Sequence, residues 1–334
     1  MLPDFSEDAI ADSFFENVSD ITIVACGTAM YAGMVGKTMI QNRLHIPVTV
    51  AIASEFRYEE PVINEKSMVI VVSQSGETID TLEALRLANK YTKKTLSIVN
   101  VKGSSIARES SYVLYTHAGP EISVASTKAY MVQISIMYLI AFELAYAKNK
   151  ITKEECEQYT KYLEEMPQVL EDTLNLKEKC QYAASKLMNA DSLLYIGRGL
   201  DYASSMEGSL KLKEISYIHS ESYAAGELKH GTISLITENM PVIAVATQMD
   251  LVEKTISNIK EVKARGALVI LVAAQEVEVE DGVADIIIRL PKTPQMFMPM
   301  TAAVPLQLIA YYTAVLKGND VDKPRNLAKS VTVE

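Results

Sequence analysis

Short apolar runs alternate along this chain with longer stretches in which apolar residues recur at helical spacing. The runs at 21–27, 48–54 and 67–73 are mostly apolar, which is typical of strands buried on both faces. The runs at 95–101 and 111–117 predict two further strands. Because amphipathic stretches lie between these runs, the pattern predicts a mostly parallel sheet with helices on both faces.

The same succession of runs occurs twice, which indicates an internal repeat. The pattern of 21–27 recurs at 192–199, that of 67–101 at 240–273, and that of 111–117 at 284–291. The apolar helix expected at 131–147 likewise has a counterpart at 302–316. We therefore expect two doubly wound α/β subdomains, each a mostly parallel sheet flanked by helices. Their boundaries are predicted at 1–147 and 189–316, with a charged helical connector at 148–188 and a C-terminal tail at 317–334.

Composition and charge narrow the possible functions. The formal net charge is −10, which argues against a non-specific nucleic-acid binder. The three cysteines, Cys26, Cys156 and Cys180, are widely spaced and odd in number, so we expect a reducing compartment and no disulfide framework. The sequence does not open with a signal peptide, and the apolar run 131–147 contains a glutamine and a glutamate. We therefore expect a cytoplasmic protein without membrane attachment, in which this run is a buried or interface helix.

A cluster of small polar residues follows the strand expected at 67–73. It comprises Ser73, Gln74, Ser75, Gly76 and Thr78, and we call the segment from Ser73 to Thr78 the serine loop. A strand-to-helix turn exposes the first N–H groups of the helix, and glycine allows the backbone to approach a ligand closely. The matching stretch of the second half reads ATQMD, so the fold does not require the hydroxyls. The loop therefore predicts a phosphate site.

Other interpretations of the serine loop are weaker. A single hydroxyl from Ser75 or Thr78 would suffice to cap the following helix. Neither the GxxxxGK[ST] nor the GxGxxG motif occurs, which argues against a nucleotide or dinucleotide site. A second hydroxyl-rich turn contains Ser126 and Thr127, which are either simple helix caps or contacts to the sugar end of a ligand at the carboxyl ends of the strands.

The densest group of ionisable residues lies at 207–232. Glu207, Lys211 and Glu214 fall on one face of an expected helix, either as a solvated stripe of ion pairs or as catalytic groups. His219 and His230 follow on segments expected to be irregular. Their spacing does not suit a metal site, and we expect no metal and no organic cofactor.

A phosphate site together with a carboxylate, an amine and an imidazole predicts proton transfer on a sugar phosphate. Ketose–aldose isomerisation needs a base that carries a proton between C1 and C2, an acid/base group that opens the ring, and donors to the enediol oxygen.

Several motifs resemble those of one known family. The segments ACGTAMYAG, ASEFRY, SQSGETIDTL, GPEISVASTKAY, KLKEISYIH, AAGELKHG and VDKPRNLAKSVTVE are similar to the isomerase half of glutamine–fructose-6-phosphate aminotransferase, also called glucosamine-6-phosphate synthase. The resemblance covers about 20–334. It implies two sugar isomerase (SIS) domains, in agreement with the repeat.

The resemblance also implies roles for individual residues. The serine loop residues Ser73, Gln74, Ser75 and Thr78 would hold the 6-phosphate, and Glu214 would move the proton between C1 and C2. Lys211 would lie near the enediol oxygen, Lys329 would form an imine with the ketose, and His230 would help to open the ring from a neighbouring subunit. The further residues assigned to substrate binding are Thr28, Glu121, Val124, Ser126, Arg325 and Ala328.

Two features depart from the family pattern. Ala29 stands where the family often has a serine that contributes to the phosphate site, so we expect one hydroxyl contact to be lost. The family's glutaminase domain, which begins with a nucleophilic cysteine, is not part of this sequence. We therefore expect either a domain of a longer enzyme or a stand-alone relative, without glutamine hydrolysis.

Fructose 6-phosphate, glucosamine 6-phosphate and glucose 6-phosphate are the expected ligands, and a homodimer or larger assembly is the expected state. Two alternatives remain open from the sequence. One is a sensor that binds a phosphosugar without chemistry, and the other is a related isomerase or deglycase for amino-sugar phosphates.

Overall fold

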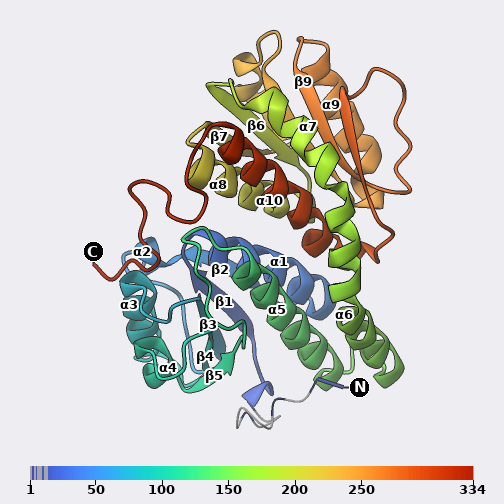
Figure 1. Cartoon of the computed structure of the whole chain (residues 1–334). Helices are drawn as coiled ribbons and strands as arrows, with labels where there is room; N and C mark the ends of the chain where they lie inside the picture. Colours follow the sequence, from blue (N-terminus) through green and yellow to red (C-terminus); the bar gives the residue numbers. More distant parts are fainter. Residues whose placement is uncertain (1, 4, 6–9, 11–13, 334) are drawn as a thin grey trace. The chain divides into compact units, whose positions relative to one another are not determined.

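The computed structural model describes residues 2, 3, 5, 10 and 14–333 (Figure 1). The chain forms two compact units. The first comprises Met1–Ile122, Ser126–Glu164 and Ala328–Glu334, and the second comprises Ser123–Ala125 and Glu165–Leu327. The end of the chain is therefore shared, because the residues up to Leu327 belong to the second unit and those after it to the first.

The first unit is built on a parallel five-stranded sheet with the order β2-β1-β3-β4-β5. Helices α1 and α5 pack together beside this sheet, and α3 contacts β1, β3 and α4 (Figure 1). The strands are β1 (Asp20–Ala25), β2 (Val48–Ile52), β3 (Ser67–Ser73), β4 (Thr95–Val99) and β5 (Tyr112–Tyr115), and the helices are α1 (Gly27–Leu44), α2 (Ala53–Phe56), α3 (Ile79–Ala88), α4 (Ser105–Glu109) and α5 (Lys128–Ala147).

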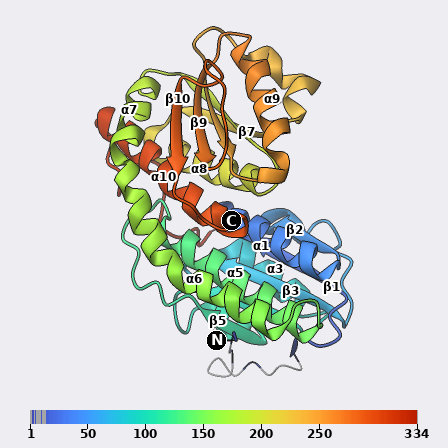
Figure 2. The ribbon, with the colours of Figure 1, turned by 90° about the vertical axis from the view of Figure 1, so that its right-hand side faces the viewer.

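The second unit repeats this topology. Its parallel sheet has the order β7-β6-β8-β9-β10, with α8 and α7 packed on α10 and with α9 against β8 and β9 (Figure 2). The two-subdomain α/β fold expected from the repeat is therefore confirmed. The strands are β6 (Ser192–Gly197), β7 (His219–Ala224), β8 (Pro241–Ala246), β9 (Leu268–Ala274) and β10 (Ile286–Leu290). The helices are α7 (Lys177–Leu187), α8 (Leu200–Ser216), η4 (Glu227–His230), η5 (Thr232–Leu235), η6 (Met249–Leu251), α9 (Val252–Lys263), η7 (Gln295–Phe297) and α10 (Met298–Leu316).

The segment expected as a connector contains α6 (Lys153–Thr173) and the short helix η3 (Leu174–Leu176), followed by α7. The division between the two units falls within α6, after Glu164.

The central strands explain why the apolar runs were continuous. All seven residues of β3 and all six of β8 are buried. A strand in the middle of a parallel sheet is covered by helices on both faces, so its side chains find apolar surroundings in both directions.

The sequence analysis was wrong about His219, which lies on strand β7 and not on an irregular segment. Within the part of the chain that the structure describes, this strand, HSESYA, pairs with β6 alone, at the edge of its sheet, and Ser220 is its one buried residue. An edge strand with so many polar residues has neither a continuous apolar run nor a clear alternation, so hydrophobic patterning does not detect it.

Helix α5 and the stretch Gln295–Leu316 are each long and apolar enough to cross a membrane, judged by length and hydropathy alone. However, 67% of the apolar window in each is buried inside the protein. Such burial is typical of a core helix, which agrees with the sequence-based expectation that 131–147 is a buried or interface helix.

Candidate functional site

The serine loop connects the buried end of β3 to the first turn of α3. The hydroxyl of Ser73 accepts a hydrogen bond from the backbone N–H of Gly76 (3.0 Å) and lies 3.0 Å from the hydroxyl of Thr78. The hydroxyl of Ser75 accepts one from the N–H of Glu77 (3.2 Å). Thr78 occupies the N-cap position of α3 without a capping hydrogen bond from its side chain. The simple capping interpretation of Thr78 is therefore wrong, and the hydroxyls instead organise the loop.

Glycine is required at the centre of this loop for two reasons. Gly76 has φ +67°, and a Cβ atom there would lie 2.0 Å from Oγ of Ser104. The carbonyl of Gly76 accepts a hydrogen bond from the N–H of Ile106 (3.0 Å), and the carboxylate of Glu77 accepts one from the N–H of Ser105 (2.8 Å). Hydrogen bonds from Ser105 hold the pKa of Glu77 below its usual value. The start of α4 thus fixes the backbone of the loop.

The last residues of the chain lie against the serine loop, within the first unit. The hydroxyl of Ser330 donates to that of Ser75 (3.0 Å), and the carbonyl of Val331 accepts from the N–H of Ile79 (3.2 Å), the first residue of α3. Sequence reasoning missed Ser330 and Val331, since no periodicity marks the tail. The resemblance pointed only to the segment as a whole.

Glu121 joins the tail to the start of α5. Its carboxylate accepts hydrogen bonds from the N–H groups of Thr127 (2.9 Å) and Ala129 (3.2 Å), from the hydroxyl of Ser126 (3.0 Å) and from Nζ of Lys329 (2.6 Å). Burial raises the pKa of Glu121, but these hydrogen bonds outweigh it, and the pKa lies below its usual value. Glu121 therefore caps α5, and neither Ser126 nor Thr127 acts as a simple side-chain cap.

In the second unit, α8 carries a group of charged residues that we call the lysine–carboxylate cluster: Glu207, Lys211 and Glu214. Nζ of Lys211 lies 2.6 Å from Oε2 of Glu214 and 3.6 Å from Oε1 of Glu207. The side chains of Lys211 and Glu207 are 3% and 2% exposed, whereas that of Glu214 is 20% exposed. The solvated-stripe interpretation is therefore wrong, because two of the three residues are shielded from water.

The environment of Lys211 keeps it protonated. Burial lowers its pKa, but the two carboxylates outweigh this effect and raise it above the ordinary value. The cluster therefore presents a fixed ammonium beside a carboxylate, Glu214, that water and small ligands can reach.

The remaining expected residues have varied surroundings. His230 is exposed at the end of η4 in the second unit. Val124, which belongs to the same unit, donates its backbone N–H to the carbonyl of Asp322 (3.0 Å). The guanidinium of Arg325 lies 4.2 Å from the ring centroid of Tyr217. The hydroxyl of Tyr217 also accepts a hydrogen bond from the backbone N–H of Arg325 (2.8 Å).

In the first unit, the carbonyl of Gln74 accepts the N–H of Asn100 (3.1 Å). Thr28 is half-buried in the first turn of α1, and Ala328 is exposed.

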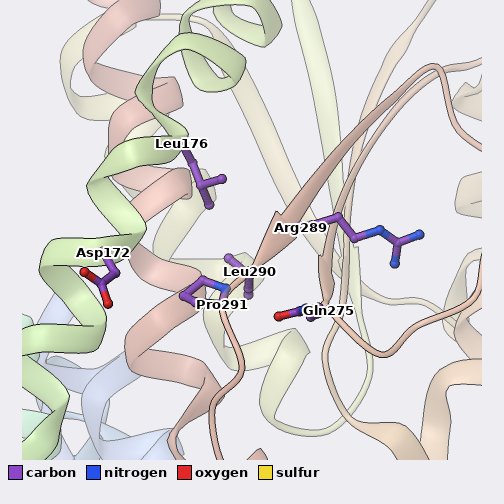
Figure 3. A pocket seen from close by; sticks show the side chains of 6 residues that line it. All are labelled: Asp172, Leu176, Gln275, Arg289, Leu290 and Pro291. Carbon is purple, nitrogen blue, oxygen red and sulfur yellow. The ribbon is translucent and has the colours of Figure 1, made fainter.

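A pocket of about 420 Å³ lies in the second unit beside the ends of β9 and β10 (Figure 3). None of the expected site residues lines it. The guanidinium of Arg289 extends away from Asp172 and Leu176 (Figure 3). It donates a hydrogen bond to the carbonyl of Val277. The lining residues are Asp172, Leu176, Gln275, Arg289, Leu290 and Pro291.

Among the described residues, no group of three or more His, Cys, Asp or Glu side chains is arranged to hold a metal ion.

Comparison with known proteins identifies the two halves. The SIS domain model matches residues 14–142 and 186–317. This chain belongs to the SIS domain family. It is 54% identical over 319 residues to a glutamine–fructose-6-phosphate aminotransferase (isomerizing) from Caldanaerobacter subterraneus, and 52% identical over 327 residues to one from Clostridium acetobutylicum. These matches cover 96% and 98% of the chain, which spans about half the length of these relatives (52% and 54%).

A solved structure shares the whole two-domain SIS fold. It is the C-terminal domain of glucosamine–fructose-6-phosphate aminotransferase from Francisella tularensis, with 40% sequence identity and a TM-score of 0.90. The match covers 94% of this chain and 89% of that domain. The resemblance inferred from the motifs is thereby confirmed.

Replacing Gly76 by alanine will destabilise the first unit more than the same change at Gly103. Both glycines have positive φ, so each substitution costs about 1–2 kcal/mol of backbone strain. A Cβ at Gly103 meets nothing within 4 Å, whereas one at Gly76 collides with Ser104 and adds about 1–3 kcal/mol. Urea denaturation of Gly76→Ala and Gly103→Ala measures the difference, and equal losses would show that the contact with Ser104 does not constrain the loop.

Replacing Lys211 by methionine will destabilise the second unit by about 3–5 kcal/mol, because Glu207 loses the ammonium beside it in a buried site. In the wild type the folded pKa of Lys211 lies above its unfolded value of about 10.4. Its contribution to stability is therefore fully present below that pH and is lost as the pH rises further.

The Lys211→Met variant should instead gain stability as the pH falls from 7 to 5, because protonation removes the charge of Glu207. Urea denaturation midpoints at several pH values measure both trends. The double variant Glu207→Gln/Lys211→Met should recover most of the loss, and a double variant as unstable as Lys211→Met would contradict this account.

Proposed function

We propose that this chain is the sugar-phosphate isomerase part of a glutamine–fructose-6-phosphate aminotransferase. It would convert fructose 6-phosphate and ammonia to glucosamine 6-phosphate. The observation that carries the proposal is the lysine–carboxylate cluster, in which a buried ammonium lies 2.6 Å from a carboxylate that is 20% exposed. The relatives named above, which are about half identical over nearly the whole chain, support the choice of substrate.

The serine loop would bind the 6-phosphate of the sugar. The hydroxyls of Ser73 and Thr78 lie 3.0 Å apart, and Ser75 lies in the same loop, directly before the first turn of α3, where N–H groups carry partial positive charge. Gln74 and Thr28 would complete the set of donors. Because Ala29 has no hydroxyl, we expect weaker phosphate binding than in relatives with serine there.

Glu214 would act as the base of the isomerisation. It would take a proton from C1 of the open-chain sugar imine while the imine nitrogen gains a proton, and would return it to C2 while the C1 hydroxyl loses its proton. The imine at C2 thereby becomes an amine, C1 becomes the aldehyde of the aldose, and Glu214 ends in its initial state. The ammonium of Lys211 would stabilise the negative charge that develops on the oxygen at C1 as its hydroxyl proton leaves. Without ammonia the same transfer would interconvert fructose 6-phosphate and glucose 6-phosphate.

Lys329, His230 and the remaining residues would serve the earlier steps. Lys329, held by the anionic Glu121, would form an imine with C2 of the ketose, and His230 would assist ring opening. His230 is exposed, which suits a role at the site of a neighbouring subunit in a homodimer or larger assembly. Val124, Ser126, Arg325 and Ala328 would line the bound sugar.

The Glu214→Gln variant will lose catalysis while it still binds substrate. Glutamine keeps the shape of the side chain but cannot accept the C1 proton, so kcat should fall by roughly 10²–10⁴-fold. The Kd of fructose 6-phosphate should change less than threefold, because the serine loop is intact. Formation of glucose 6-phosphate from fructose 6-phosphate, and of glucosamine 6-phosphate when ammonium is added, measures turnover, and calorimetry measures binding.

The matched control is Glu253→Gln, which makes the same change at an exposed position of α9 and should leave both quantities unaltered. Turnover retained in Glu214→Gln would exclude Glu214 as the base. Binding without turnover in the wild type would favour a phosphosugar sensor.

A further inference from the structure

Asp201 is a buried carboxylate in the first turn of α8 that the proposed reaction does not use. Only 2% of the residue is exposed. Its Oδ2 accepts hydrogen bonds from the backbone N–H groups of Thr247 (2.8 Å) and Gln248 (3.2 Å), and its Oδ1 accepts one from the hydroxyl of Thr247. We call these donors, the two N–H groups and the hydroxyl, the anion seat.

The anion seat occupies the place in the second unit that the serine loop occupies in the first. Thr247 and Gln248 directly follow β8, as Gln74 and Ser75 directly follow β3. The strands before the two loops also pair in the same way. Strand β8 is parallel to β6, with Leu194 opposite Val242, and β3 is parallel to β1, with Thr22 opposite Val69. In both units the loop therefore follows a strand that pairs with the unit's first strand in chain order, β6 or β1.

Asp201 corresponds in the same way to Ala29. Asp201 lies four residues after Gly197, the last residue of β6, and Ala29 lies four residues after Ala25, the last residue of β1. Halfway along each of these segments stands a glycine with positive φ, Gly199 at +57° in the second unit and Gly27 at +53° in the first. A glycine with positive φ thus stands at the start of both α8 and α1, and the two units differ here in whether a carboxylate follows it.

Burial and hydrogen bonding have opposite effects on the ionisation of Asp201. Burial raises the pKa of Asp201 to about 6, although the hydrogen bonds from Thr247 and Gln248 lower it. What supports an oxyanion at this position is the geometry, since two backbone N–H groups and a hydroxyl all donate to the oxygens of the carboxylate.

We propose that Asp201 is a built-in anion that fills the second unit's counterpart of the phosphate-binding loop, so that only the first unit accepts a phosphate. The proposal rests on the phosphate role proposed above for the serine loop. It has a direct consequence: without the Asp201 carboxylate, the anion seat becomes a second site for a tetrahedral oxyanion.

Two reciprocal variants test the proposal, with inorganic phosphate as the probe. Asp201→Ala gives the second unit the residue that the first unit has, and equilibrium dialysis with radiolabelled phosphate should show two phosphates per chain instead of one. Ala29→Asp places a carboxylate beside the serine loop, and phosphate bound per chain should fall from one to none. The control Asp201→Asn keeps the seat occupied by a neutral side chain of the same shape, so its stoichiometry should remain one.

The outcomes separate this proposal from the proposed function. If the wild type binds no phosphate, the role of the serine loop fails, and a single site gained in Asp201→Ala would still support the anion seat. If the wild type binds one phosphate and a folded Asp201→Ala also binds one, the anion seat is refuted alone. Should Asp201→Ala not fold, Ala29→Asp decides: normal phosphate binding in that variant would overturn the proposal.

Discussion

All strands within each sheet run parallel, and this constraint brings the carboxyl ends of the strands and the N-termini of the following helices to the same edge of the sheet. Backbone N–H groups at such an edge need acceptors or a ligand. The first unit meets this need with the hydroxyls of the serine loop, and the second meets it with the carboxylate of Asp201. One topology thus gives a loop whose N–H groups donate to hydroxyls in one half and a loop whose N–H groups donate to a buried carboxylate in the other.

The lysine–carboxylate cluster places charged side chains on helix α8 of the second unit. Burying Lys211 between Glu207 and Glu214 contributes little net stability, because desolvation offsets most of the attraction between the charges. What the arrangement secures is a fixed ammonium beside a partly exposed carboxylate. A carboxylate next to a cation, both held on one rigid helix, suits a reaction in which a proton moves between adjacent carbon atoms while negative charge develops on an oxygen of the intermediate.

Much of the fold could be predicted from the sequence because central parallel strands such as β3 are buried on both faces and therefore read as continuous apolar runs. Strand β7 could not, because its polar residues pair on one side only. The serine loop was detectable from its cluster of hydroxyls, to which only the hydroxyl of Thr247 corresponds in the matching stretch of the second half. Three further features depend on segments far apart in the chain, which hydrophobic patterning does not connect. They are the ion pair of Glu121 with Lys329, the contacts of Ser330 and Val331, and the hydrogen bonds that Asp201 accepts from Thr247 and Gln248.

The most direct test of the account follows hydrogen at carbon rather than product formation. The chain would be incubated with fructose 6-phosphate in deuterium oxide without ammonia, and ¹H NMR would monitor C1 of the ketose and C2 of the aldose. The account predicts that deuterium appears at these carbons at a rate that saturates with substrate concentration, because Glu214 exchanges its proton with solvent while it holds it. Saturable binding of fructose 6-phosphate with both carbons left fully protonated and no aldose formed would contradict it.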